Sequence, residues 1–173
     1  MVDEWLRSPS LRSLLPVSMR PVRSILFDKT PQENWPVIWH QDLTIAVLER
    51  QECAGYGPWS IKEETPHVQP PLFLLKQMVT LRLHLDETPE ENGALRVVPG
   101  SHRLGRITSD QIPGLTCAAV VTCACQAGDV LLMSPLLLHS SSRSQVPHHR
   151  RVIHIEFAPT DALDPRLQWY EPE

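Results

Sequence analysis

The chain has 173 residues, a length that suits a single domain over residues 1–173 with a core large enough to need no disulfide or structural metal. Hydrophobic residues make up 42% and charged residues 21% of the sequence, which excludes an intrinsically disordered chain. The net charge of -4 argues against a nucleic-acid-binding surface spread over the whole chain. No apolar run is long enough to cross a membrane, and the acidic N-terminus is unlike a signal peptide, so we expect a cytoplasmic protein.

The spacing of proline residues favours short strands over long helices. There are 17 prolines, and they fall between β-branched runs rather than in one tract. Helix is expected only within residues 1–15 and at 70–76. The expected strands, in chain order, are 22–28, 37–39, 44–48, 78–85, 95–98, 120–125, 130–133, 136–138 and 151–157.

The clearest alternation of polar and apolar residues lies in the strand expected at 78–85. Its leucines share one face, while the other face carries Thr80, Arg82 and His84. Successive side chains of a strand point to opposite faces, so this pattern predicts a polar interior of a β-barrel.

Residues 49–71 form a long connection that contains several glycines and prolines. Connections of this length are uncommon unless they serve as lids or binding loops, so we expect an active-site lid. Tyr56 and Trp59 could either cover a pocket or pack the loop against the barrel, and His67 is a weaker candidate for substrate contact. The four cysteines form no CxxC pair and are expected to be free thiols rather than zinc ligands.

A histidine and a carboxylate stand two residues apart at His40 and Asp42. In an extended chain these side chains project from the same face and can reach one ion. Two imidazoles and one carboxylate form the facial arrangement of Fe(II) oxygenases, and His139, after an apolar run, is the candidate second imidazole. Beyond it, Arg150 could bind a dicarboxylate through its planar guanidinium. Arg151 is the alternative, because neighbours on a strand face opposite ways.

Together with the run 85–102, which ends in Pro99-Gly100-Ser101-His102, these motifs resemble the phytanoyl-CoA dioxygenase family. The resemblance extends from about Val22 to Ala158. Members of this family are Fe(II)- and 2-oxoglutarate-dependent oxygenases with a double-stranded β-helix, also called a jelly roll or cupin-like barrel. We therefore expect a mainly β protein with little helix.

The resemblance implies that His40, Asp42 and His139 bind Fe(II). It also implies that Arg150 binds the distal carboxylate of 2-oxoglutarate, with Ser141 as a hydrogen-bonding neighbour. The expected reaction is the hydroxylation of a small molecule by O2, with release of succinate and CO2. The carboxylate at Asp42 favours hydroxylation over halogenation, because halogenating relatives have a small residue there.

Arg82 departs from the family, which often has a tryptophan at this position. Its inward-facing place could add a contact to 2-oxoglutarate or to an anionic substrate. His84 and His102 are expected to be structural, and His148 and His149 to be solvated. Asn92-Gly93 is expected to form a turn with positive φ.

Two alternatives to the hydroxylase remain. Few residues precede the first expected strand, where family members usually carry a longer region, so a truncated or impaired member could bind a small ligand without turnover. A cupin-like enzyme that uses another metal without 2-oxoglutarate would leave the arginine near the distal histidine without a purpose. The sequence leaves the primary substrate and the oligomeric state open.

Overall fold

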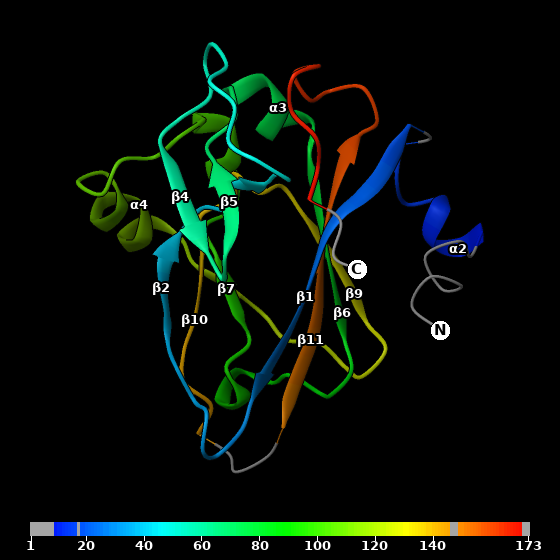
Figure 1. Cartoon of the computed structure of the whole chain (residues 1–173). Coiled ribbons are helices and arrows are strands. Elements are labelled where there is room, and N and C mark those ends of the chain that lie inside the picture. The colour runs from blue at the N-terminus through cyan, green and yellow to red at the C-terminus, as the bar shows by residue number, and fades with distance from the viewer. Residues whose placement is uncertain (1–8, 17, 146–148, 171–173) are drawn as a thin grey trace.

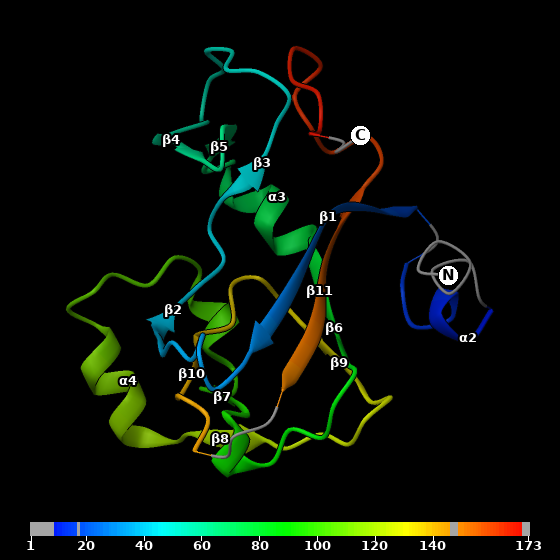
Figure 2. The same cartoon turned by 60° about the horizontal axis from the view of Figure 1, so that its bottom comes forward.

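The computed structural model describes residues 9–16, 18–145 and 149–170. Two four-stranded antiparallel sheets form the two walls of the molecule, and a smaller three-stranded sheet lies at one end (Figure 1). The turned view shows the two larger sheets facing each other, with the small sheet above them (Figure 2). This mainly β arrangement confirms the jelly-roll expectation.

The first large sheet has the order β1-β11-β6-β9, and the second has the order β2-β10-β7-β8. The small sheet has the order β3-β5-β4. The strands of the first sheet are β1 (Met19–Lys29), β11 (Arg150–Pro159), β6 (Val79–His84) and β9 (Val130–Met133). Those of the second are β2 (Val37–His40), β10 (His139–Ser141), β7 (Leu95–Val97) and β8 (Val121–Cys123). Those of the third are β3 (Ile45–Ala46), β5 (Thr65–Val68) and β4 (Trp59–Lys62).

Within the described residues, helix is confined to short segments outside the sheets. They are α2 (Pro9–Arg12), α3 (Leu72–Gln77) and α4 (Ile112–Ala118), with 3-10 turns η1 (Glu90–Asn92) and η2 (Ser101–Leu104). The helix expected at 70–76 is confirmed as α3, and part of the N-terminal expectation lies outside the described residues. Among the described residues, no helix has the length and hydrophobicity needed to span a membrane.

The inner face of the first sheet is polar, as the alternation in β6 predicts. Thr80, Arg82 and His84 are all buried, and Arg82 lies opposite His154 in the register of β6 with β11. Leu81 points the other way into an apolar cluster that includes Leu11, Leu15, Met19, Ile155 and Phe157. The N-terminal segment thus covers the outer face of this sheet and leaves the polar residues to the interior.

The local structure differs from the elements expected from the sequence in three places. Residues 136–138 form a turn rather than a strand, because Pro135 begins the turn and the amide of Leu137 donates to Ser134 O. Strand β10 therefore begins at His139 instead of ending there. The connection 49–71 contains the β4–β5 hairpin. Helix α4 was not expected, because it buries no side chain and so has no amphipathic pattern.

Candidate active site

His40 and His139 lie side by side at the ends of paired strands. Their Cα atoms are partners in the β2–β10 ladder, and their ring centroids are 4.2 Å apart. Each ring places Nδ1 2.8 Å from a backbone carbonyl two residues earlier, that of Ile38 or Leu137. A carbonyl can only accept, so Nδ1 carries the proton in both rings. In a neutral ring the lone pair is then on Nε2, the atom that faces Asp42.

Asp42 completes a cluster of three ligand atoms that all lie within 4.8 Å of one another. Its Oδ1 is 3.5 Å from Nε2 of His40, and its Oδ2 is 3.7 Å from Nε2 of His139. Oδ2 is buried and has no hydrogen-bond partner among the described residues. Two imidazole nitrogens and a carboxylate that converge in this way fit a divalent cation. The nitrogen and oxygen donors, with both Nδ1–H groups fixed by carbonyls, are the ligand set expected for iron or a similar metal.

The side chain of Gln41 fixes the loop that carries His40 and Asp42. Gln41 points away from them and is buried, and its Nε2 donates to Gly105 O (2.8 Å) and Leu136 O (2.6 Å). Its Oε1 accepts from the amide of Ile107 at 2.8 Å. This contact with the turn before β10 ties the loop of the first histidine to that of the second.

The run 85–102 contacts β10 on the side opposite β2. Strand β7 pairs with β10, and Ser101 Oγ accepts from the amide of Leu138, the residue before His139, at 2.8 Å. Gly93 has φ +68, and a Cβ there would lie 2.7 Å from Ser142 O, so this close approach requires glycine. The expected positive-φ turn at Asn92-Gly93 is thus confirmed, and the run positions the distal histidine.

The three clustered groups have shifted pKa values. Burial tends to raise the pKa of Asp42, but the neighbouring histidines, His40 first, outweigh it and hold that pKa well below its usual value. Burial lowers the pKa of His139 to about 4. Burial also tends to lower the pKa of His40, but the hydrogen bond and charge of Asp42 raise it above 6.5 overall. Asp42 is therefore ionised and His139 neutral at pH 7, as metal binding requires.

A small cavity of about 60 Å³ lies on one side of this cluster and is lined by three buried cations. Lys29, Arg82 and Arg150 have relative exposures of 1%, 6% and 3%. No ion pair joins any of them to a carboxylate in the described part of the chain. The Nε atoms of both arginines are buried without a hydrogen-bond partner. Buried charge without a partner is costly, so this cavity fits a ligand with two negative charges.

Arg150, rather than Arg151, faces this cavity. Its Nη2 donates to Ser141 Oγ at 3.1 Å, and burial lowers its pKa to about 10. Arg151 is exposed on the opposite face, where its guanidinium pairs with Asp86 at 2.7 Å. The alternation along β11 thus separates the two arginines as expected.

Lys29 is a cavity residue that the sequence analysis missed. Its Nζ donates to Ser141 Oγ at 2.9 Å and also to Ser142 O, and its Cα is the partner of Arg150 in the β1–β11 ladder. Burial and the charges of Arg150 and Arg82 lower its pKa to about 8. The strand expected at 22–28 ended one residue before Lys29, and the inward position of Lys29 follows from the register of β1 with β11.

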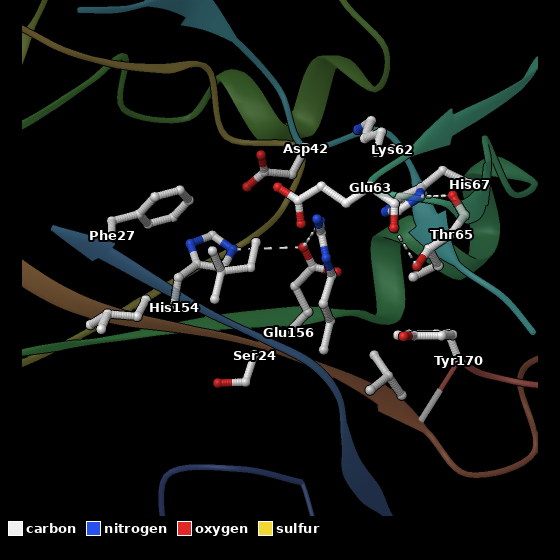
Figure 3. Close-up of a pocket in the computed structure, with 15 residues that line it drawn as sticks. Ser24, Phe27, Asp42, Lys62, Glu63, Thr65, His67, His154, Glu156 and Tyr170 are labelled. Atoms are coloured by element: carbon white, nitrogen blue, oxygen red, sulfur yellow. Dashed lines mark hydrogen bonds and ion pairs between the residues drawn. The ribbon is translucent and has the colours of Figure 1, made fainter. Parts of the chain in front are cut away.

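A larger cavity of about 630 Å³ is also lined by Asp42 (Figure 3). Phe27, Asp42 and His154 line both cavities, so of the three clustered ligands Asp42 borders both. His67 lines the larger cavity, as considered from the sequence. Tyr56 and Trp59 instead pack against the apolar core, which favours the second of the two expectations for them.

The other histidines that the structure describes, and the cysteines, lie outside the cluster. His84 is buried, with Nδ1 2.9 Å from Thr88 Oγ1, and His102 lies in η2. His149 is exposed beside Asp28, and His148 lies outside the described residues. The described structure contains no second group of three potential metal ligands. All four cysteines are free.

Several solved structures share this fold. EvdMO1 has a TM-score of 0.64 and 26% identity, with 91% of this chain and 32% of that protein covered. AviO1 from Streptomyces viridochromogenes Tue57 has a TM-score of 0.63 and 23% identity, with 93% and 62% covered. EctD from S. alaskensis has a TM-score of 0.68 and 19% identity, with 92% and 52% covered. The chain thus spans between a third and two thirds of these proteins.

No curated protein matches the sequence. Residues 2–152, however, match the phytanoyl-CoA dioxygenase (PhyH) family, and the matched segment includes the cluster of His40, Asp42 and His139 together with Arg150. A match over most of the chain shows common descent, so this chain belongs to the phytanoyl-CoA dioxygenase (PhyH) family.

Proposed function

We propose that the protein is an Fe(II)- and 2-oxoglutarate-dependent dioxygenase that hydroxylates a small molecule. The observation that carries this proposal is the convergence of His40 Nε2, His139 Nε2 and the Asp42 carboxylate, with both Nδ1–H groups held by backbone carbonyls. These three residues would hold the metal on one face and leave positions for co-substrate and O2. When bound, the iron would supply the oxygen chemistry.

The cavity with three cations is the proposed site of 2-oxoglutarate. Arg150 would bind the distal carboxylate, with Ser141 and Lys29 as hydrogen-bonding neighbours on the same oxygen network. Arg82 would add positive charge at the metal end of the cavity. EctD, which shares the fold, has been solved with bound Fe and with 2-oxoglutarate, and this supports the assignment.

The larger cavity is the proposed site of the primary substrate. It reaches Asp42, and the β4–β5 hairpin within 49–71 forms one of its walls through Lys62, Glu63 and His67. We propose that the segment 49–71 acts as the cover of this cavity. The protein would then hold the two organic molecules on opposite sides of the metal and exclude water from the space between them.

The proposal is tested by incubating the protein with Fe(II), 2-oxoglutarate and O2 and measuring succinate. Metal-dependent succinate release that the variant His139→Ala lacks is the expected result. Binding of Fe(II) and 2-oxoglutarate with no succinate, alone or with a panel of candidate substrates, would support the alternative of a ligand-binding barrel without turnover.

A further inference from the structure

The larger cavity contains a carboxylate that is buried yet only partly engaged. Glu156 lies on the inner face of β11 and is 4% exposed. Arg23 Nη1 lies 3.4 Å and His154 Nε2 lies 3.7 Å from it, and both contacts fall on Oε1 (Figure 3). No described residue makes a hydrogen bond or ion pair with Oε2. A carboxylate oxygen can only accept, so Oε2 is available to a donor group of a ligand in this cavity.

His154 can donate to the carboxylate of Glu156 only through its Nε2–H. Its Nδ1 lies 3.0 Å from Nη1 of Arg82, and a guanidinium can only donate, so Nδ1 is the acceptor. Arg82, His154, Glu156 and Arg23 therefore form one chain along the inner face of the first sheet. Because the contacts of Arg23 and His154 both fall on Oε1, Oε2 of Glu156 remains as an acceptor in the larger cavity.

His67 offers a second acceptor in the same cavity. The side chain is 2% exposed, and Nδ1 donates to Thr65 O at 3.0 Å. Nε2 then carries the lone pair of the neutral ring, and it is buried with no partner among the described residues. Burial lowers the pKa of His67, which keeps the ring neutral. Figure 3 shows Glu63 on the same hairpin, with its side chain directed toward Glu156 and Asp42.

The cations that line this cavity are Arg23 and Lys62, and in the described structure only Arg23 is paired with a carboxylate. Arg23 pairs with Glu156, and the exposed Lys62 donates to Thr44 Oγ1 at 3.0 Å at the edge of the cavity. The larger cavity is therefore rich in acceptors, whereas the small cavity beyond Asp42 is rich in donors. A ligand carboxylate or phosphate placed beside Glu156 would meet a like charge.

We infer that the primary substrate is a polar molecule that donates hydrogen bonds to Glu156 and His67 through hydroxyl or protonated amine groups, and is not an acid or an acyl thioester. This inference rests on the proposed function, because it takes the larger cavity as the substrate site. Its volume, about 630 Å³, accommodates a molecule at least as large as a monosaccharide.

The test compares four sugars that share one ring and differ in one group: glucosamine, glucose, glucuronate and glucose 6-phosphate. Binding to the full metal-free chain is followed by saturation-transfer NMR, which detects weak binding and requires neither iron nor 2-oxoglutarate. We expect glucosamine and glucose to bind, with glucosamine at least about 10-fold tighter than either acid. Equal or tighter binding of either acid, or no binding of either donor sugar, would overturn the inference.

Variants then assign the effect to residues. Glu156→Gln should weaken glucosamine about 10-fold, and His67→Phe should weaken glucose and glucosamine alike. The control Glu64→Gln changes an exposed carboxylate of the same hairpin that does not line the cavity, and it should alter neither affinity. Unchanged glucosamine binding in Glu156→Gln would contradict the assignment, and the wild-type comparison stands even if a variant fails to fold. Failure of metal or 2-oxoglutarate binding would refute the proposed function without changing these sugar affinities.

Discussion

His40 and His139 are paired residues of neighbouring strands, and each ring is held by the carbonyl two residues before it. This shared geometry turns both Nε2 atoms toward Asp42 before any metal arrives. Metal binding therefore requires little reorganisation of the side chains, since neither ring has to rotate or change tautomer. The site is thus preorganised by backbone contacts rather than by long side-chain networks.

Removing the carboxylate should abolish metal binding. For Asp42→Ala we expect the affinity for Fe(II), measured anaerobically by calorimetry, to fall by about 100-fold or more, together with loss of succinate formation. Asp110→Ala, an exposed carboxylate remote from the cluster, is the control. Undiminished turnover in Asp42→Ala would refute the metal assignment.

Metal affinity should depend on pH through one histidine rather than two. The pKa of His40 is raised above 6.5 mainly by Asp42 against the opposing effect of burial, whereas burial lowers the pKa of His139 to about 4. Protons compete with the metal, so affinity falls with falling pH, and only His40 has to lose a proton above about pH 5. The logarithm of the affinity should change by about one per pH unit between pH 6 and 5. A change of two per unit would show that His139 also titrates there, and no change would exclude His40 as a ligand.

Replacing Arg150 by lysine should affect the co-substrate and spare the metal. Lysine keeps the charge but loses the planar pair of donors, so we expect Arg150→Lys to raise the 2-oxoglutarate requirement about 10-fold with Fe(II) affinity nearly unchanged. Arg151→Lys, on the outer face beside Asp86, serves as the matched control. If Arg151→Lys raised the 2-oxoglutarate requirement and Arg150→Lys did not, then Arg151 rather than Arg150 would bind 2-oxoglutarate.

Lys29 should make stability rise in mildly alkaline solution. Its folded pKa is about 8, lowered from 10.5 by burial, then by Arg150 and Arg82, so the unfolded chain binds more protons between these values. The free energy of unfolding should therefore increase from pH 8 toward 10.5, by up to about 3 kcal/mol. Lys29→Met should lack this increase and bind 2-oxoglutarate more weakly. Parallel stability curves for the two proteins would contradict a buried, charged Lys29.

The side chain of Gln41 should matter for stability and for metal affinity. Gln41→Leu leaves the Leu136 and Gly105 carbonyls and the Ile107 amide without their partner, which should cost about 3 kcal/mol in chemical unfolding. Fe(II) affinity should fall about 10-fold as the loop of His40 and Asp42 loosens. Gln51→Leu, on the surface, is the control. Equal stability and equal Fe(II) affinity of the two variants would show that the hydrogen bonds of Gln41 do not hold the loop of His40 and Asp42.

The candidate metal ligands could be proposed from the sequence because their spacing carries the geometry. An HxD pair in extended chain places both side chains on one face, and the later histidine followed by an arginine completes the pattern. The alternation at 80–85 likewise predicted the polar interior, since a two-residue period is a property of any strand.

Other features were beyond local sequence patterns. The run 136–138 is apolar because Leu136 and Leu138 are buried from within a turn, and burial alone does not distinguish a turn from a strand. The inward position of Lys29 depends on the register of β1 with β11, which joins residues far apart in the chain. The β4–β5 hairpin is short and contains Pro66, so its strands carry no alternation long enough to detect.

The position of bound iron can be measured by anomalous diffraction. Crystals grown anaerobically with Fe(II) and 2-oxoglutarate should show one iron peak within bonding distance of His40 Nε2, His139 Nε2 and the Asp42 carboxylate, with 2-oxoglutarate extending toward Arg150. An iron peak elsewhere, or none at this position in a protein that retains the fold, would contradict the assignment of these three residues as metal ligands.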